Sequence, residues 1–245
     1  MAWRPRDGTG LSTPHVVELD FVAGAREARG LAVVIDVFRA FSVAAYAFDR
    51  GARAIHPVAA IEEALALRAA HPDWLLIGER HARQLTGFDF GNSPTQIVAA
   101  DLAGRTLVHT THSGTQGLAN AIHADEVITG ALVNAGAIVR YIQSRRPAVV
   151  SLVRMGHEAR ERCAEDDLCA ALIRARLEGR EFDTAGICER LRTAPSAAKF
   201  FDPAAHWAPE PDFDYCTDVD RFDFVLRVAS SSDGLRQLVR VQGCF

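Results

Sequence analysis

Acidic residues stand where apolar runs of the chain give way to polar ones. Asp36 and Glu79 each close an apolar run, and Asp166 lies in the acidic triplet 165–167 that opens a helical pattern. Asp36 could cap a helix or pair with Arg39, and acids at a helix start also suit the helix dipole. Carboxylate oxygens are equally the ligands that Mg²⁺ takes, often only one or two per site. A structural and a metal-binding interpretation therefore stand side by side.

Residues 78–97, GERHARQLTGFDFGNSPTQI, form a polar stretch directly after an apolar run. Its Gly, Asn, Asp and Pro residues are typical of turns. Loops of this length in compact domains are often functional. As part of a site, Glu79 would supply a carboxylate, while Asn92 and Ser93 would donate hydrogen bonds to an anion. We expect this stretch to form a wall of an active site.

A second candidate anion site follows the apolar run 105–111. Ser113, Gly114 and Thr115 connect that run to a helical pattern, and amides and hydroxyls at a helix start bind anions. An ordinary Ser/Thr helix cap is the alternative. His109 and His112 frame the same strand end, but a zinc site would need a third ligand that the sequence does not identify.

Apolar runs alternate with helical patterns over most of the chain. Strands are predicted at residues 31–37, 52–58, 74–79, 105–111, 126–132 and 148–155, and helices at 39–51, 59–72, 114–123, 134–146 and 165–179. This alternation predicts one α/β domain over residues 1–245, a three-layer α/β/α fold with a mainly parallel, mixed sheet. Two late strands, 222–229 and 236–242, are expected to pair antiparallel at a sheet edge. Ligands of such sheets bind at the carboxyl ends of the strands, where the candidate residues accumulate.

Composition argues against several classes of protein. The chain has 245 residues, of which 49% are hydrophobic, enough for a substantial core. A net charge of −4 without a basic block makes nucleic acid an unsuitable partner. Five scattered cysteines without C-x-x-C spacing indicate reduced thiols. The first 15 residues lack the apolar segment of a signal peptide and no run is long enough to span a membrane, so we expect a cytoplasmic protein.

Five motifs, in this order, resemble the magnesium-dependent 2-phosphosulfolactate phosphatases. They are VVIDVFRA, GERHARQLTGFDFGNSP, TTHSGT, EDDLCAALI and YCTDVDRFDFVL, between residues 33 and 226. The resemblance implies an α/β/α fold, a Mg²⁺ cofactor and a small anionic phosphorylated substrate. The reaction it implies is hydrolysis of 2-phosphosulfolactate to sulfolactate and phosphate, in coenzyme M biosynthesis.

Carried over by motif, the resemblance implies an acidic metal site of Asp36, Glu79 and Asp166, which together with Arg39 are the candidate catalytic residues. The candidate substrate-binding residues are Asn92, Ser93, His112, Ser113, Gly114 and Thr115. Glu79 would serve as a metal ligand or as general base for an attacking water. A phospho-aspartate at Asp36 is the alternative, although Phe38 replaces the second acid of the D-x-D arrangement often seen with that chemistry.

The sequence departs from the family pattern at several positions. Phe41-Ser42 stands where Thr-Thr is usual, His112 where Asn is usual, Ala171 where Gly is frequent, and RHARQ follows Glu79 in place of a glycine-rich loop. These departures bear on the substrate more than on the reaction class. Two alternatives therefore remain, a phosphatase for another phosphorylated hydroxy acid and a non-catalytic small-anion binding protein. A homodimer formed through the late strands is compatible with the sequence.

Overall fold

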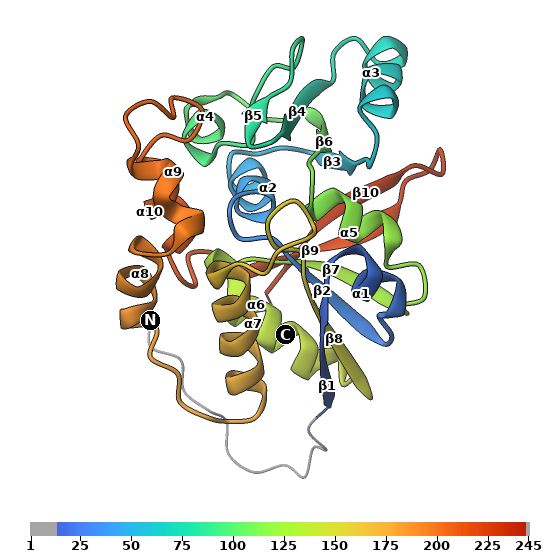
Figure 1. Cartoon of the computed structure of the whole chain (residues 1–245). Helices are drawn as coiled ribbons and strands as arrows, with labels where there is room; N and C mark the ends of the chain where they lie inside the picture. The colour runs from blue at the N-terminus through green and yellow to red at the C-terminus, as the bar shows by residue number, and fades with distance from the viewer. Residues whose placement is uncertain (1–13, 244–245) are drawn as a thin grey trace.

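The computed structural model describes residues 14–243 (Figure 1). The first 13 residues, on which much of the signal-peptide expectation rests, and Cys244 lie outside this range. The four described cysteines are free thiols, as expected. Within the same range, no helix is long and apolar enough to cross a membrane.

Within residues 14–243, a ten-stranded mixed sheet has the order β1-β8-β2-β7-β9-β10-β3-β6-β4-β5. The strands are β1 (His15–Asp20), β2 (Leu31–Ile35), β3 (Ala54–Pro57), β4 (Leu75–Arg80), β5 (Arg83–Gln84), β6 (Thr106–Thr110), β7 (Glu126–Gly130), β8 (Val149–Arg154), β9 (Phe224–Ser230) and β10 (Arg236–Gln242). Most neighbouring pairs outside the β9-β10 hairpin are parallel, so the predicted mixed α/β class is confirmed.

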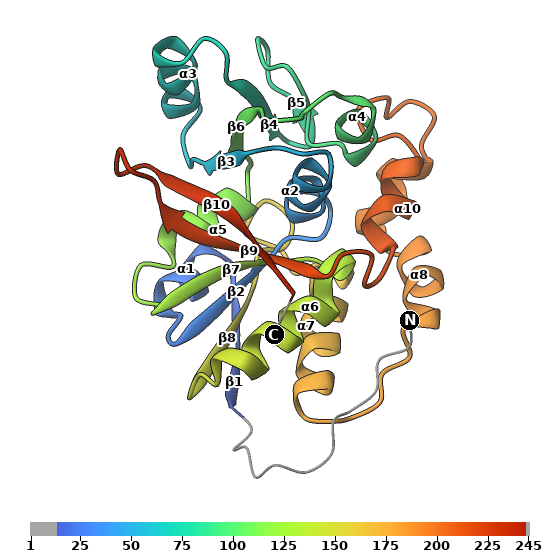
Figure 2. The same ribbon diagram turned by 180° about the vertical axis from the view of Figure 1, so that it is seen from behind.

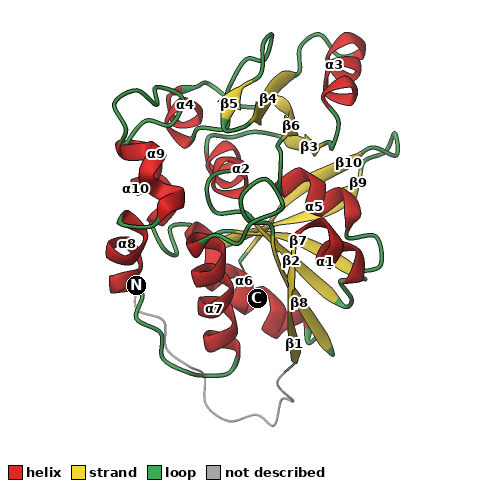
Figure 3. Ribbon diagram, viewed as in Figure 1, coloured by secondary structure: helices red, strands yellow, loops and turns green. Residues whose placement is uncertain are grey.

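Helices cover both faces of the sheet (Figure 3). They are α1 (Phe21–Glu27), α2 (Ala40–Asp49), α3 (Ile61–Ala70), α4 (Pro94–Ala99), α5 (Gly114–Asn120), α6 (Ala135–Arg145), α7 (Ala164–Leu177), α8 (Ala185–Arg192), α9 (Ala198–Phe201) and α10 (Pro211–Thr217). One core joins α1, α2 and α5 to the sheet, and a second joins α6, α7 and α10 to it. This is the expected three-layer arrangement.

Strand β2 shows why the apolar runs predicted strands correctly. Val34 packs into the core with α2 and α5, whereas Val33 and Ile35 pack into the core with α6 and α7. A parallel strand covered on both faces is apolar at every position, which makes it recognisable in the sequence. The strand ends at Ile35, so Asp36 follows it directly and is positioned at its carboxyl end.

The late strands pair antiparallel as expected, but their predicted place at the sheet edge is wrong. β9 pairs with β10 along its whole length, from Phe224 opposite Gln242 to Ser230 opposite Arg236. β9 also contacts β7, and β10 contacts β3, so the hairpin crosses the middle of the sheet (Figure 2). The edges are β1 and β5. On its outer side each late strand is bridged at one residue pair, Arg227 of β9 with Ile128 and Leu238 of β10 with Ile55.

The central hairpin joins two groups of parallel strands, and it changes their relative direction. Pairing is antiparallel at each of the three steps β7-β9, β9-β10 and β10-β3, so β3, β6 and β4 are connected in the opposite sense to β2 and β8. In a flat sheet the carboxyl ends of the two groups would lie at opposite edges. Strand twist of about 20–25° per step accumulates to roughly 120–150° between β2 and β4, close to a half turn. The carboxyl ends of both groups can therefore line one pocket.

The C-terminal third is more regular than the sequence indicated. Helices α8, α9 and α10 follow α7, and α10 packs against α4 and α9. These helices are short and interrupted by prolines, which weakened their periodic signal. They matter for the site because they place Lys199 and Asp212 beside the elements that carry the predicted site residues.

Candidate active site

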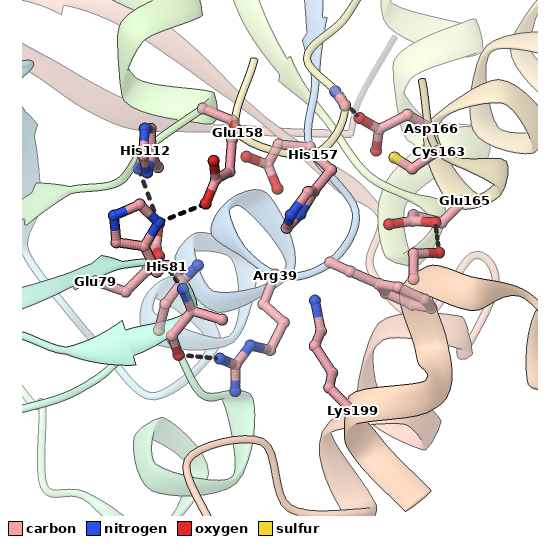
Figure 4. Close-up of a pocket in the computed structure, with 17 residues that line it drawn as sticks. Arg39, Glu79, His81, His112, His157, Glu158, Cys163, Glu165, Asp166 and Lys199 are labelled. Atoms are coloured by element: carbon pink, nitrogen blue, oxygen red, sulfur yellow. Dashed lines mark hydrogen bonds and ion pairs between the residues drawn. The ribbon is translucent and has the colours of Figure 1, made fainter. Parts of the chain in front are cut away.

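One pocket lies where the carboxyl ends of β2, β4, β6 and β8 meet the start of α7 (Figure 4). Seven sequence-predicted site residues line it: Asp36, Arg39, Glu79, Asn92, His112, Ser113 and Asp166. The stretch 78–97 contributes Glu79 and Asn92, so it does form part of the pocket wall. The structure thus brings together residues that are up to 130 positions apart in the chain.

Asp36 and Asp166 are two buried carboxylates held by backbone N–H groups. Asp36 Oδ1 accepts a hydrogen bond from the N–H of Ala40 at 3.2 Å, in the first turn of α2. Asp166 accepts from the N–H groups of Val37 and Gly156, at 2.9 and 2.8 Å. Because Val37 follows Asp36, this contact ties the start of α7 to the end of β2. We call Asp36 and Asp166 the acidic pair.

Burial and mutual repulsion disfavour the ionised forms of the acidic pair. Burial raises the pKa of Asp36 to about 7, and the negative charge of Glu79 adds to the increase. Burial also raises the pKa of Asp166, and here the charge of Asp36 contributes. A bound cation favours the ionised form of such carboxylates. The pair therefore has the donor chemistry of a site for a hard cation.

The predicted third metal ligand, Glu79, is fixed by the backbone of two loops. Its Oε1 accepts from the N–H of His112 at 2.8 Å and its Oε2 accepts from the N–H of Ala82 at 2.7 Å. Each oxygen keeps a second lone pair. Within residues 14–243, however, the group of three close ligand atoms is a different one. It comes from His81, His112 and Glu158, whose ligand atoms all lie within 4.8 Å of one another. Asp36 and Asp166 without Glu79 still fit Mg²⁺, which often takes one or two carboxylates.

Arg39 does not pair with Asp36, as its position in the sequence suggested, but with Asp212 of α10. The Arg39 Nη1 to Asp212 Oδ2 distance is 2.7 Å, and the side chains are 2% and 0% exposed. Nη1 also donates to the carbonyl of Trp207 and Nη2 to that of Ala82. Arg39 thus lines the pocket while it anchors α10. Asp212 was missed because nothing near it in the sequence marks its partner.

Three of the predicted substrate-binding residues do not line the pocket. Ser93 caps α4 and its hydroxyl donates to Asp212 at 2.9 Å. The Thr115 hydroxyl donates to the carbonyl of Thr111 at 3.1 Å. A Cβ on Gly114 would lie 2.8 Å from Asp36 Oδ2, so this glycine allows α5 to approach Asp36 closely. These contacts give the three residues structural roles, and direct substrate binding by them stays a prediction.

Several lining residues were not identified from the sequence. His81 and Glu158 enter from the loops after β4 and β8. Glu165, which the sequence marked only as part of the acidic triplet 165–167, accepts a hydrogen bond from Ser196. Lys199, the lone lysine of the chain, also lines the pocket. Its Nζ lies 5.2 Å from the centre of the Phe200 ring. The sequence marked Lys199 in one way, because it is the single lysine of an arginine-rich chain.

His109 supports the wall of the pocket from within the sheet. Its Nε2 lies 3.3 Å from Oδ1 of Asn92, which lines the pocket, and its side chain is 1% exposed. Burial lowers the pKa of His109 from 6.5 to about 4. His109 is therefore neutral in the folded protein at pH 7 and is not a cation for substrate.

We expect His109 to make the folded protein less stable in mild acid. Between pH 6.5 and 4 the unfolded chain binds a proton at this position and the folded protein does not, so stability falls as pH falls. From pH 7 to 4.5 the free energy of unfolding should decrease by roughly 2 kcal/mol more in the wild type than in His109→Gln. Urea denaturation at the two pH values measures this difference. Equal decreases in both proteins would contradict it.

The fold and the pocket together define an α/β/α protein with buried carboxylates and cationic side chains at one site, the composition of metal-assisted anion sites. The family model of the 2-phosphosulpholactate phosphatases matches residues 20–231. The chain belongs to this family, which confirms the resemblance seen in the motifs.

Individual relatives agree with this assignment. The chain is 32% identical over 205 residues to the probable 2-phosphosulfolactate phosphatase of Bacillus subtilis (strain 168), covering 82% of this chain and 88% of that protein. It is 36% identical over 203 residues to the protein of the same name from Thermotoga petrophila, covering 79% and 87%. A third such protein, from Gloeobacter violaceus, is 39% identical over 156 residues, covering 63% and 66%.

Proposed function

We propose that this chain is a Mg²⁺-dependent phosphatase acting on the phosphate ester of a small anionic 2-hydroxy acid. The substrate we propose is 2-phosphosulfolactate, hydrolysed to sulfolactate and phosphate. Membership of the family supports the reaction class. The observation that carries the proposal is the acidic pair, because two buried carboxylates in one pocket have the donor chemistry of a cation site.

The acidic pair would hold the Mg²⁺ ion. When bound, the ion would draw negative charge from a phosphate oxygen. The chain itself adds positive charge in the pocket through Lys199, although its net charge is −4, whereas the charge of Arg39 is already paired with Asp212. Asn92 and Ser113 add uncharged polar groups to the wall. These side chains would bind and orient a substrate that bears several acid groups.

We favour direct attack by water over a phospho-aspartate. The water oxygen would form the new bond to phosphorus, the ester P–O bond would break, and a water proton would end on the leaving 2-hydroxyl oxygen. The position two residues after Asp36 is Phe38, which packs edge-on against Phe200. It therefore offers no second acid for a covalent route. Phosphoryl transfer depends mostly on positioning and charge stabilisation. Glu79, which two backbone N–H groups hold in place, would position the attacking water and accept its proton.

The proposal predicts phosphate release that needs Mg²⁺ and prefers the sulfonate. The assay compares 2-phosphosulfolactate with 2-phospholactate, each with Mg²⁺ and with EDTA. We expect release with Mg²⁺, essentially none with EDTA, and a higher kcat/KM for 2-phosphosulfolactate. Faster release from 2-phospholactate would favour another phosphorylated hydroxy acid as substrate. The histidines that line the pocket, among them His112 where the family usually has Asn, are the observation that favours this alternative. Mg²⁺ binding without release from any phosphate ester would favour the anion-binding alternative.

A further inference from the structure

Two histidines and one glutamate from three separate loops meet at the side of the pocket opposite the start of α7 (Figure 4). His81 follows β4, His112 follows β6 and Glu158 follows β8. His81 Nδ1 lies 2.5 Å from Glu158 Oε1, and the His81 and His112 ring centres are 5.0 Å apart. One ligand atom from each residue lies within 4.8 Å of those of the other two. We call these three residues the histidine cluster.

The His112 ring has an unfilled bonding position. Its Nδ1 is buried and has no hydrogen-bond partner within the described part of the chain. A buried polar atom without a partner costs about 1–3 kcal/mol. The backbone N–H of His112 donates to the Glu79 carboxylate, which fixes the position of His112 in the pocket wall. A ligand of the imidazole would remove the cost.

The other two members are also suited to bind an ion. The Glu158 side chain is 24% exposed, and its contact with His81 holds the carboxylate against the two imidazoles. The His81 side chain is 70% exposed, so its ring can turn towards an ion without disturbing the core. Two imidazoles and one carboxylate form a known three-ligand set for zinc that leaves a position open for water or substrate.

We propose that His81, His112 and Glu158 bind one divalent transition-metal ion, for which Zn²⁺ is the reference probe. The site is distinct from the acidic pair, because imidazole nitrogen suits zinc and related metals whereas Mg²⁺ requires oxygen ligands. The histidine cluster lines the same pocket, so the ion adds positive charge on the wall across from the acidic pair. The proposal does not depend on phosphatase activity.

The test is Zn²⁺ binding by the full chain after chelator treatment and dialysis. Competition with a chromogenic chelator, in excess Mg²⁺, gives the stoichiometry and the dissociation constant. We expect one Zn²⁺ per chain that Mg²⁺ does not displace. His81→Ala, His112→Asn and Glu158→Gln should each weaken binding by at least about tenfold, because even outer-shell changes cost 10–100-fold. X-ray absorption of the zinc complex should show nitrogen and oxygen ligands without sulfur.

Two control variants separate the cluster from other ligands in the pocket. His157 and Cys163 line the same pocket but lie outside the cluster, so His157→Ala and Cys163→Ser should bind Zn²⁺ like the wild type. Thermal melts would show that each variant is folded. No saturable binding, or binding that survives all three cluster substitutions, would overturn the proposal, as would loss of binding in Cys163→Ser. A failed phosphatase assay would leave Zn²⁺ binding unchanged, so the two proposals fail independently.

Discussion

Asp36→Asn is expected to lower kcat at least about a thousandfold while leaving the fold intact. Asparagine has nearly the same shape, and its oxygen can still accept from the N–H of Ala40. The change removes the negative charge that would hold Mg²⁺ and leaves Asp166 as the sole acid of the pair. It also removes a charge whose burial is costly, so the thermal midpoint should not fall. Steady-state kinetics at saturating Mg²⁺ and a thermal melt measure both effects.

Asp167 provides the matched control for this substitution. It is next to Asp166, but its carboxylate pairs with Arg162 at 2.9 Å and with Arg154 at 3.5 Å, and it does not line the pocket. Asp167→Asn should therefore keep kcat within about twofold of the wild type, because its carboxylate pairs with arginines outside the pocket. A near-normal rate in Asp36→Asn would remove Asp36 from the mechanism, whatever the control shows.

Asp212→Ala is expected to destabilise the protein by about 3–5 kcal/mol, the cost of removing one partner of a buried ion pair. The substitution leaves the Arg39 charge buried and unpaired. It also removes the acceptor of the Ser93 hydroxyl and of the Thr95 N–H, at 2.9 and 2.8 Å. Because these contacts join α10 to α2 and to α4, the site should lose its shape together with its stability. Urea denaturation followed by circular dichroism measures the free energy of unfolding.

Two further variants make this result specific. Asp214 lies on the same helix, but its side chain is 68% exposed and its pair with Arg192 is a loose one at 3.6 Å. Asp214→Ala should therefore cost less than about 0.5 kcal/mol. The double variant Arg39→Met/Asp212→Ala should be less destabilised than the sum of the two single variants, since no unpaired charge remains. Strict additivity, or a loss below about 1 kcal/mol for Asp212→Ala, would contradict the role given to this pair.

Local patterns in the sequence determined the fold class and much of the site. The apolar run of β2 identified a strand covered on both faces, and the polar residues after such runs pointed to Asp36 and Glu79. The acidic triplet at a helix start pointed to Asp166. This was possible because burial on both faces and the end of a strand leave marks within a few residues. The stretch 78–97 was recognisable for the same reason, since its turn residues stand directly after a strand.

Only the tertiary structure decided which distant residues meet. Arg39 and Asp212 are 173 positions apart, and no local pattern indicates that α10 carries the partner of Arg39. The place of β9 and β10 in the middle of the sheet, and the convergence of His81, His112 and Glu158, are also long-range. Periodicity in a sequence reports whether a side chain is buried, whereas the identity of its neighbour depends on strand order, sheet twist and helix packing, which the whole chain sets together.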